Sequence, residues 1–520
     1  MGATSSICAT AAKWLSALAL AAATVLSGCA TLPGDVQRAP SEALTDVAAT
    51  PLAQLAASST PDDKRHLSGL RLLPNGPEAL AARLALAQRA QKSLDVQYYV
   101  VSADESGRQF LRELRDAAAR GVRVRLLIDD LHAGAQDELL LGLAAHDNVQ
   151  VRLFNPLPVR GDAFETRLLL SLHQFARVNR RMHNKLFIAD NSVAVTGGRN
   201  IADEYFMRSE TANFIDMDLL SVGPVVRGLS DVFDRYWNSE LAFPVEALVP
   251  LRGSREQARA RFHGWAGRGS ALPKEGVAAE LSSQTTLALR FAPVSVFADE
   301  PSKASGKLPV PATAMDSALL MMRSAQSEVL IVSPYFVPGE GGLRLMRAAI
   351  DSGIHISVMT NSLASTDEPL AYGGYARYRT PMLKLGVALS ELSPLPSRRF
   401  EMIGDTRSSL GRLHAKVAVI DRRWLLVGSM NMDGRSSRTN TEASLVIDDV
   451  ALASATLALM QQRWSDSHYR LRITAADDGI EWIEPDDDDG PVVHRTEPHI
   501  GWLSRLRLNV LSMFVAEEFL

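Results

Sequence analysis

One pattern of residues occurs twice in this 520-residue chain, with the same internal spacing each time. The first copy begins at His183 and the second at His414, and both read H-x-K-x4-D-x6-G-[GS]-x-N. Each copy lies in an apolar run that is typical of a β-strand. Packing alone gives no reason to keep His, Lys, Asp, Gly and Asn at one spacing in two places. The repeat therefore indicates two half-sites of one functional site rather than two buried structural histidines.

The rest of the chain repeats around this pattern. Before each motif the sequence predicts a β-rich strand, an amphipathic helix, a glycine-led strand and a short strand, and after it a closing helix. Strands that alternate with helices predict an α/β fold of two duplicated halves, with mostly parallel sheets covered by helices. The expected elements are strands at 93–101 and 328–337, helices at 107–120 and 341–352, strands at 121–129 and 353–360, and strands at 149–156 and 386–394.

The first residues of the chain have the composition of an export signal. Lys13 precedes an apolar run, which ends in the small residues of a Leu-Ser-Gly-Cys sequence at Cys29. The run is shorter than the roughly 20 apolar residues of a membrane span. A plain signal peptide or an uncleaved anchor is the alternative. Both cysteines of the chain, Cys8 and Cys29, lie here, so no thiol chemistry or cysteine-based metal site is expected elsewhere.

Shifts in composition divide the remaining chain. The C-terminal residues Gly501–Leu520 are expected to form an amphipathic helix that packs onto the domain, with lipid contact as the alternative. The predicted segments are a lipoprotein signal peptide at 1–28, a flexible tether at 29–64, a first half at 65–250, an inter-half linker with a short helix at 251–290, a second half at 291–475 and an acidic loop with the amphipathic helix at 476–520.

The His-x-Lys pairs suit an anionic substrate. His183 and Lys185 stand two residues apart, so on a strand they project from one face, as do His414 and Lys416. The lysine can hold a phosphate oxygen, and the imidazole can act as nucleophile, base or acid near neutral pH. A lysine ammonium beside each histidine argues against metal ligation, so no metal is expected.

The motif aspartates and asparagines have different expected roles. Asp190 and Asp421 lie an odd number of residues from their histidines, so they leave the strand face and are expected to fix a turn or the lysine. Asn200 and Asn431 follow small residues that let the backbone approach a ligand, and they can donate amide hydrogens to phosphoryl oxygens.

A histidine that forms a covalent bond needs its other ring nitrogen held in place. Asp216 and Glu442, each downstream of a motif in an apolar run, are candidates for this role. The alternative is that each carboxylate merely ends a strand.

The doubled H-x-K-x4-D motif resembles the signature of the phospholipase D superfamily, over roughly residues 65–470. Further phrases, such as Ser-Pro-Tyr-Phe-Val-Pro from Ser333 and Asn-Thr-Glu ending at Glu442, resemble bacterial cardiolipin synthases of the C type. The resemblance implies one bilobal α/β/α domain in which both motifs meet at a pseudo-twofold cleft. It also implies a metal-free and cofactor-free reaction, in which His183 forms a phosphohistidine and His414 serves as acid and then base.

The resemblance also implies a substrate and a location. The expected function is a phosphatidyltransferase of cardiolipin synthase type, acting on phospholipids such as phosphatidylglycerol and phosphatidylethanolamine. The Leu-Ser-Gly-Cys sequence is similar to a lipobox, so Cys29 would be lipidated, and Ala30 after it suggests the outer membrane, facing the periplasm. A net charge of -4 favours no nucleic acid partner. Whether a helper protein is needed stays open.

Three alternatives remain at this point. They are a hydrolytic phospholipase D, a secreted phosphodiesterase or nuclease, and an envelope lipoprotein without activity, which would need both motifs to be relics although no motif position is lost. Gly198 stands where many members of the superfamily have serine, and little consequence is expected because a small residue is kept. The predicted site comprises His183, Lys185, Asp190, Asn200, His414, Lys416, Asp421 and Asn431, with Asp216, Glu442, Gly198 and Ser429 in support.

Overall fold

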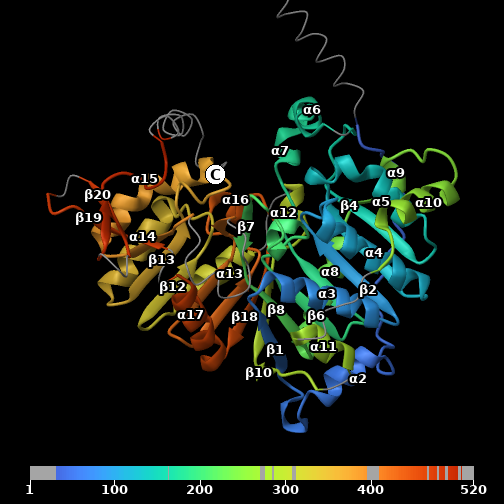
Figure 1. The fold of residues 1–520 in the computed structure, drawn as a ribbon, viewed down its shortest axis with the longest axis horizontal. Coiled ribbons are helices and arrows are strands. Elements are labelled where there is room, and N and C mark those ends of the chain that lie inside the picture. Colours follow the sequence, from blue (N-terminus) through green and yellow to red (C-terminus); the bar gives the residue numbers. More distant parts are fainter. Residues whose placement is uncertain are drawn as a thin grey trace, which may run out of the picture.

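Two sheets with helices packed on them lie side by side in the computed structural model (Figure 1). The predicted signal peptide with Cys29, the acidic run and nearly all of the predicted C-terminal helix lie outside the residues that the structure describes. These residues are 31–161, 163–269, 276–283, 286–306, 312–394, 409–464, 468–476, 479–485, 490–501 and 505.

The first sheet has the strand order β10-β1-β8-β6-β5-β2-β3-β4-β9. Its strands are β1 (Ser68–Leu73), β2 (Ser93–Tyr98), β3 (Arg123–Asp129), β4 (Val149–Phe154), β5 (Leu186–Ala189), β6 (Val193–Gly197), β8 (Asp218–Val222), β9 (Ala242–Pro244) and β10 (Arg290–Ala292).

The second sheet repeats this plan in the order β11-β18-β17-β16-β12-β13-β14-β19-β20-β21. The duplication predicted from the sequence is confirmed, because β12-β13-β14 and the hairpin β16-β17 match β2-β3-β4 and β5-β6. Its strands are β11 (Val294–Ala298), β12 (Glu328–Val332), β13 (His355–Asn361), β14 (Ala388–Leu392), β16 (Val417–Ile420), β17 (Trp424–Gly428), β18 (Ala443–Asp448), β19 (His468–Ile473), β20 (Ile480–Glu484) and β21 (Val492–His494).

The fold is α/β as predicted, but the expectation of mostly parallel sheets is wrong. In the two large sheets, parallel pairing joins only β2 to β3 to β4 and β12 to β13 to β14, and the other described pairs are antiparallel. Parallel neighbours need a crossover, which a helix supplies at these places. The motif strands instead follow one another through tight turns, which produce antiparallel hairpins.

Helices α3, α4 and α8 pack on the first sheet. The local sequence of α4 explains why that helix forms. In α4, the side chain of Asp104 caps the N-terminus by accepting from the backbone N of Gly107, while Phe110, Leu111 and Leu114 are buried on one face. The helices are α2 (Pro51–Ser58), α3 (Gly76–Arg89), α4 (Glu105–Ala119), α5 (Asp137–Ala144), α6 (Phe164–Leu170), α7 (Phe175–Val178), α8 (Pro224–Trp237), α9 (Val245–Leu248), α10 (Arg255–Ala266), α11 (Gly276–Ser283), α12 (Ser302–Ser305), α13 (Ala314–Met322), α14 (Gly339–Asp351), α15 (Pro369–Leu385), α16 (Gly434–Arg438) and α17 (Val450–Trp464).

The predicted flexible tether is docked where the structure describes it, from residue 31 onward. Arg152 donates to the carbonyl of Ala39 at 2.6 Å, and Arg125 donates to the carbonyl of Ser41 at 2.8 Å. Leu52 in α2 is fully buried. Buried guanidinium groups need acceptors, and the backbone of this polar segment supplies them, so its composition did not reveal the docking.

The predicted inter-half linker also differs from the expectation of one short helix. It contains α10 and α11, which pack against α5 and α3 of the first half. Phe262 in α10 and Val277 in α11 are buried in the first half's core. Burial of these apolar side chains outweighs the polar composition on which the expectation of a linker depended.

The halves join through strands from both. β7 (Ala212–Ile215) and β15 (Leu410–Leu413) form a separate parallel pair across the interface. An isolated β-bridge also pairs Met182 of the first half with Thr441 of the second half. One hydrophobic core, which includes Phe233 and Val417, runs through both halves. Both motifs are therefore held at this interface. Among the described residues, no helix is long and apolar enough to span a membrane.

Candidate active site

The two His-x-Lys segments lie at the junction of the halves. The sequence predicted that each His-x-Lys pair lies on a strand. In the structure, β5 begins only after Lys185 and β16 only after Lys416. The histidine backbones pair across the interface instead: the N of His183 donates to the carbonyl of Thr441 at 2.9 Å, and the N of His414 donates to that of Ile215 at 2.8 Å.

Each histidine is held by a carboxylate from the opposite half. His414 Nδ1 lies 2.6 Å from Asp216 Oδ2, and His183 Nδ1 lies 3.0 Å from Glu442 Oε2. The pairing across the interface explains this exchange, because Asp216 and Glu442 directly follow the residues whose carbonyls receive the histidine N–H groups. The sequence indicated the two acids but not which histidine each one contacts.

Glu442 is the centre of a buried polar cluster. Ser429 and Ser436 donate to its carboxylate at 2.5 and 2.8 Å. Its backbone N donates to Asp299 at 2.9 Å, and Asp299 forms a buried ion pair with Lys303 at 2.8 Å. Ser436, Asp299 and Lys303 lie outside the doubled motif, and no spacing in the sequence pointed to them.

Asp216 has a different setting, which corrects the expectation for Gly198. Its Oδ1 accepts from the backbone N of Met217 at 2.7 Å. A Cβ added to Gly198 would lie 2.2 Å from Asp216 Oδ1 and 2.7 Å from Oδ2. Serine therefore does not fit at position 198 unless the carboxylate moves, so glycine and serine are not interchangeable here.

The motif lysines are buried beside the histidines. Lys185 Nζ donates to the carbonyl of His183 and Lys416 Nζ to that of His414, each at 2.6 Å. Within the described chain this is the single hydrogen bond of each Nζ, so further N–H groups are free for an anion. Burial lowers the pKa of Lys416 to about 8, and burial lowers the pKa of Lys185 well below its usual value.

Burial favours the neutral form of both imidazoles. Burial lowers the pKa of His183 to about 4, with Glu442 opposing and Lys185 adding to this effect. Burial and the nearby Lys416 lower the pKa of His414 well below its usual value. Since the Nδ1 atoms face carboxylate oxygens, we infer that they carry the proton. In the part of the chain that the structure describes, neither Nε2 has a hydrogen-bond partner.

The carboxylates themselves differ in charge preference. Burial alone would raise the pKa of Glu442, but His183, Lys185 and Ser429 hold it below its usual value. Burial raises the pKa of Asp216, although Lys416 opposes this. Glu442 is thus the better stabiliser of positive charge on its histidine.

The motif aspartates lie away from the histidines, at the turns where strand parity placed them. Asp190 accepts from the backbone N of Lys92 at 2.7 Å and of Ser93 at 3.0 Å. Asp421 makes the same contacts with Ser327 and Glu328, at 2.8 and 3.0 Å. Their hydrogen bonds hold the backbone just before the central strands β2 and β12, and do not hold the motif lysines.

The motif asparagines are not equivalent. Asn200 donates to the Tyr205 hydroxyl at 2.9 Å and accepts from the backbone N of Val100 at 3.2 Å, so one amide hydrogen remains. The buried Oδ1 of Asn431 has no partner among the described residues. Because Oδ1 is an acceptor and phosphoryl oxygens also accept, any contact of Asn431 with a phosphoryl group must come from its Nδ2 hydrogens.

Aromatic rings enclose the histidines, and the motif did not indicate them. The ring centroid of Tyr99 lies 5.1 Å from that of His183, and those of Tyr205 and Phe214 lie 5.0 and 4.9 Å from that of His414. Both histidines are also buried from solvent.

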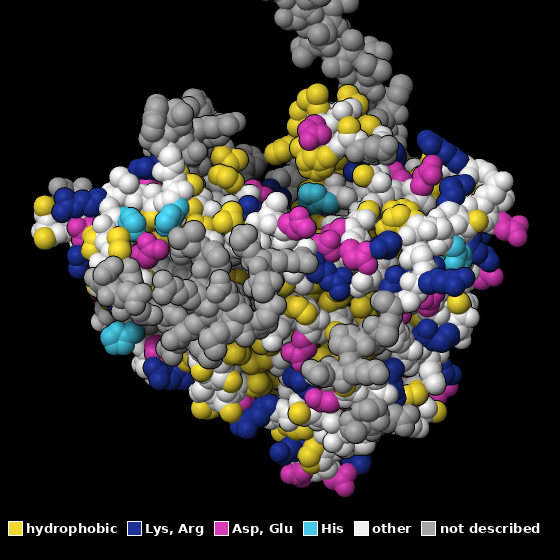
Figure 2. Space-filling model, viewed as in Figure 1, with side chains coloured by type: hydrophobic (Ala, Val, Ile, Leu, Met, Phe, Trp, Pro, Cys, Tyr) yellow, Lys and Arg dark blue, Asp and Glu magenta, His cyan; other side chains and the backbone are white. Residues whose placement is uncertain are grey.

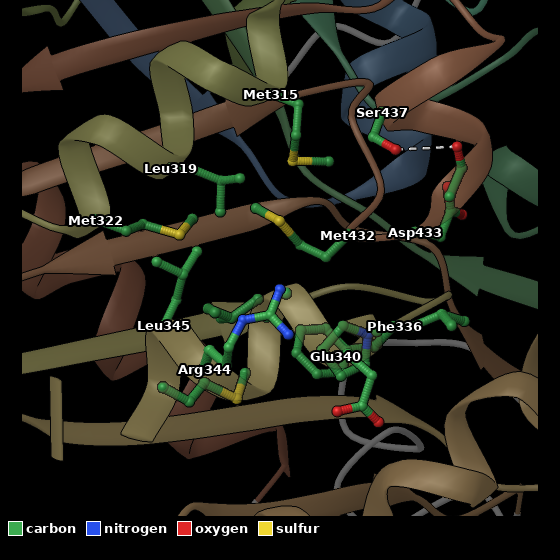
Figure 3. Close-up of a pocket in the computed structure, with 18 of the residues that line it drawn as sticks. Met315, Leu319, Met322, Phe336, Glu340, Arg344, Leu345, Met432, Asp433 and Ser437 are labelled. Atoms are coloured by element: carbon green, nitrogen blue, oxygen red, sulfur yellow. Dashed lines mark hydrogen bonds between the residues drawn. The ribbon is translucent and has the colours of Figure 1, made fainter. Parts of the chain in front are cut away.

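A separate apolar pocket of about 940 Å³ lies in the second half (Figure 3). Met315 and Leu319 of α13 and Leu345 of α14 line it, together with Phe336 and Met432. No histidine, lysine or asparagine of the doubled motif is among its lining residues. Over the described residues, no group of three or more His, Cys, Asp or Glu side chains is placed to hold a metal ion.

Comparison with known proteins identifies the family of this chain. The family described as cardiolipin synthase, PLD-like domain matches residues 84–237 and 319–464, one match in each half. The chain is 35% identical to cardiolipin synthase C of Escherichia coli (strain K12) over 463 residues, which cover 87% of this chain and 96% of that protein. It is 25% identical to cardiolipin synthase A of Pseudomonas syringae pv. syringae (strain B728a) over 74% of this chain and 66% of that protein.

A solved structure shares the fold. The crystal structure of phosphatidylserine synthase from Haemophilus influenzae Rd KW20 superimposes with a TM-score of 0.55 and 14% sequence identity, over 88% of this chain and 96% of that one. The two family matches, one for each duplicated half, account for more than half of the sequence. This chain therefore belongs to the cardiolipin synthase family of phospholipase D-like enzymes.

Proposed function

We propose that this enzyme is a phosphatidyltransferase of cardiolipin synthase type, which exchanges one phospholipid phosphodiester for another through a phosphohistidine. The observation that carries the proposal is the pair of histidines, each with Nδ1 on a carboxylate from the other half and Nε2 without a described partner. Family membership and the 35% identity to a cardiolipin synthase C support the choice of substrate class.

In the first step, His183 Nε2 attacks the phosphorus and the bond to the leaving alcohol breaks. Glu442 accepts the Nδ1 hydrogen of His183 and balances the positive charge that develops on the ring. His414 gives its proton to the leaving oxygen. Burial holds the pKa of His414 low, and a bound phosphodiester anion raises it so that the ring can carry that proton.

In the second step, the acceptor hydroxyl attacks the same phosphorus. His414, now neutral, takes the proton of that hydroxyl, the phosphorus–nitrogen bond breaks and His183 is restored. Lys185 and Lys416 stabilise the charge on the non-bridging oxygens throughout. The reaction needs no external energy source, because one phosphodiester replaces another.

The nature of the second hydroxyl decides between transfer and hydrolysis. A lipid hydroxyl yields transfer and water yields phosphatidic acid, so exclusion of water favours transfer. The rings of Tyr99, Tyr205 and Phe214 beside the histidines support transfer.

The location is part of the proposal. We infer that Cys29 is lipidated and anchors the protein in the outer membrane of a bacterium, facing the periplasm. The support is the Leu-Ser-Gly-Cys sequence at 26–29. Mass spectrometry of the N-terminal peptide from purified protein tests this, and an unmodified Cys29 in the mature chain would contradict it.

The decisive experiment is lipid product analysis. The purified enzyme is given phosphatidylglycerol and phosphatidylethanolamine in mixed micelles, and the products are read by mass spectrometry. Cardiolipin together with glycerol or ethanolamine supports transfer. Phosphatidic acid alone supports a hydrolytic phospholipase D, and cleavage only of added DNA would identify a nuclease.

A further inference from the structure

A group of large apolar side chains lies exposed on the segment that contains α6 and α7. Leu169 is 66% exposed, Leu172 49%, Phe175 41% and Phe164 36%. Figure 2 shows hydrophobic side chains gathered where α6 and α7 stand at the upper edge of the molecule in Figure 1. Soluble proteins rarely gather exposed Phe and Leu in this way unless the surface binds something.

Two arginines of this segment face the protein, although Glu165 and His173 are exposed. Arg167 of α6 is buried and donates to Asp130 at 2.7 Å. Arg177 of α7 donates to Asn155 at 2.6 Å. A helix that stabilises a domain by apolar packing has the opposite arrangement, with charges outward and leucines inward. The outward leucines therefore do not serve the fold.

The same segment is connected to the catalytic centre. The Phe164 ring stacks on His132, with centroids 5.6 Å apart, and His132 is hydrogen-bonded to the Tyr99 hydroxyl at 3.2 Å. Tyr99 packs edge-on against His183. Just beyond α7, Arg180 donates to the carbonyl of Lys303 at 3.2 Å, in the second half. The exposed apolar group thus borders the junction of the halves.

The start of the described chain lies on the same side. Figure 1 shows the first described residues, in blue, at the same upper edge of the molecule as α6. Cys29, the predicted lipidation residue, is two positions before residue 31. A lipid on Cys29 would therefore bring this edge to the membrane.

We propose that residues Phe164–Val178 form a membrane-inserting element, whose leucines and phenylalanines enter a phospholipid bilayer and seat the active-site mouth on the lipid surface. A bilayer is preferred to a protein partner because the side chains project outward from short helices beside the site, and because the substrate proposed above resides in a bilayer. The choice of lipid as occupant rests on the proposed function. Side chains of this kind bind the headgroup and acyl boundary.

A position-specific probe tests the insertion. In the full-length chain with Cys8→Ser and Cys29→Ser, a single Leu169→Cys is labelled with an environment-sensitive fluorophore. The matched control carries Leu320→Cys on α13, where the leucine is 70% exposed. Whatever the first thirty residues contribute to vesicle binding is common to both proteins, so a difference between them reports the position alone.

Insertion predicts a clear difference on phosphatidylglycerol and phosphatidylethanolamine vesicles. The probe at 169 should shift to the blue and be quenched by lipids that carry a spin label near the headgroup end of the acyl chain, whereas the probe at 320 should do neither. Equal, water-like emission at both positions overturns the proposal. If the labelled variant inserts at 169 but the wild-type enzyme yields no phosphatidyl transfer product, the proposed function is refuted and this inference stands.

An activity comparison separates membrane seating from a structural role. The triple variant Leu169→Ser, Leu172→Ser, Phe175→Ser should lose about 10-fold or more of its turnover on vesicles. Its turnover on a monomeric short-chain phosphatidylglycerol should stay near the wild-type value, and Leu320→Ser should affect neither. An equal loss on both substrates would show that the leucines act on the fold, and it would overturn the proposal.

Discussion

Replacing Gly198 by alanine should damage catalysis although the change adds only one carbon. The new Cβ would lie 2.2 Å from Asp216 Oδ1, whereas ordinary contacts begin near 3.4 Å. The carboxylate must therefore move by about 1 Å. Such a shift breaks the 2.6 Å bond between Asp216 and His414. The backbone at Gly198 is not itself strained, so we expect the fold to persist.

The size of the effect follows from that bond. A hydrogen bond to a charged group contributes about 1.5 to 3 kcal/mol. At about 1.4 kcal/mol for each tenfold change in rate, Gly198→Ala should lower kcat/KM by about 10- to 150-fold. If His414 also takes up the wrong tautomer, the loss will exceed this range.

The assay is turnover of a short-chain phosphatidylglycerol, with thermal unfolding by circular dichroism as the check on folding. Ser429→Ala is the matched variant of the other half, because it removes the hydroxyl that donates to Glu442 without adding an atom. It should lose activity over the same range of about 10- to 150-fold, but with no steric displacement of the acid. Wild-type turnover in a folded Gly198→Ala variant would refute the reasoning. The double variant Gly198→Ser, Asp216→Glu copies the second half and should recover part of the loss.

The remaining predictions concern the motif itself. His183→Ala and His414→Ala should each abolish turnover in folded protein, and near-normal activity in either would rule out the two-histidine scheme. Lys185→Ala or Lys416→Ala should each cost on the order of 3 kcal/mol of transition-state stabilisation in kcat/KM, by analogy with the loss of one oxyanion donor. The pH profile of kcat/KM should fall below about 4, where protonated His183 loses its lone pair. It should also decline with rising pH as His414 loses the proton it must donate, and more steeply above about 8, where Lys416 loses its charge. An alkaline pH optimum of kcat/KM would contradict these assignments.

Much of the fold could be predicted because its signals are local. The predicted helix at 107–120 corresponds to α4 (Glu105–Ala119), where a cap and an apolar period coincide. The duplication is visible because the motif keeps its spacing in both halves. Strand direction was mispredicted because alternation of elements does not distinguish a crossover from a hairpin, and the tight turn at Asp190 produces a hairpin.

Site residues that recur at a fixed spacing could be predicted from the sequence. Residues that join the site only through contacts in the folded chain could not. Asp299 supports Glu442 from a distant part of the chain, and its ion pair with Lys303 has the i,i+4 spacing found on any helix surface. The docking of residues 31–64 depends on Arg125 and Arg152 reaching backbone carbonyls, which no side-chain pattern encodes.

Gly198 shows why a duplicated motif need not stay symmetric. The two half-sites meet the same requirement, a carboxylate on the Nδ1 of the partner histidine, with different pairs: Asp216 with Gly198, and Glu442 with Ser429. The shorter acid fills the space that a serine side chain would need, while the longer acid accepts a bond from the serine hydroxyl. Each small residue is therefore matched to the acid of its own half, and that acid serves the other half's histidine. A change at position 198 is thus expected to act on His414, although His183 belongs to the same motif copy.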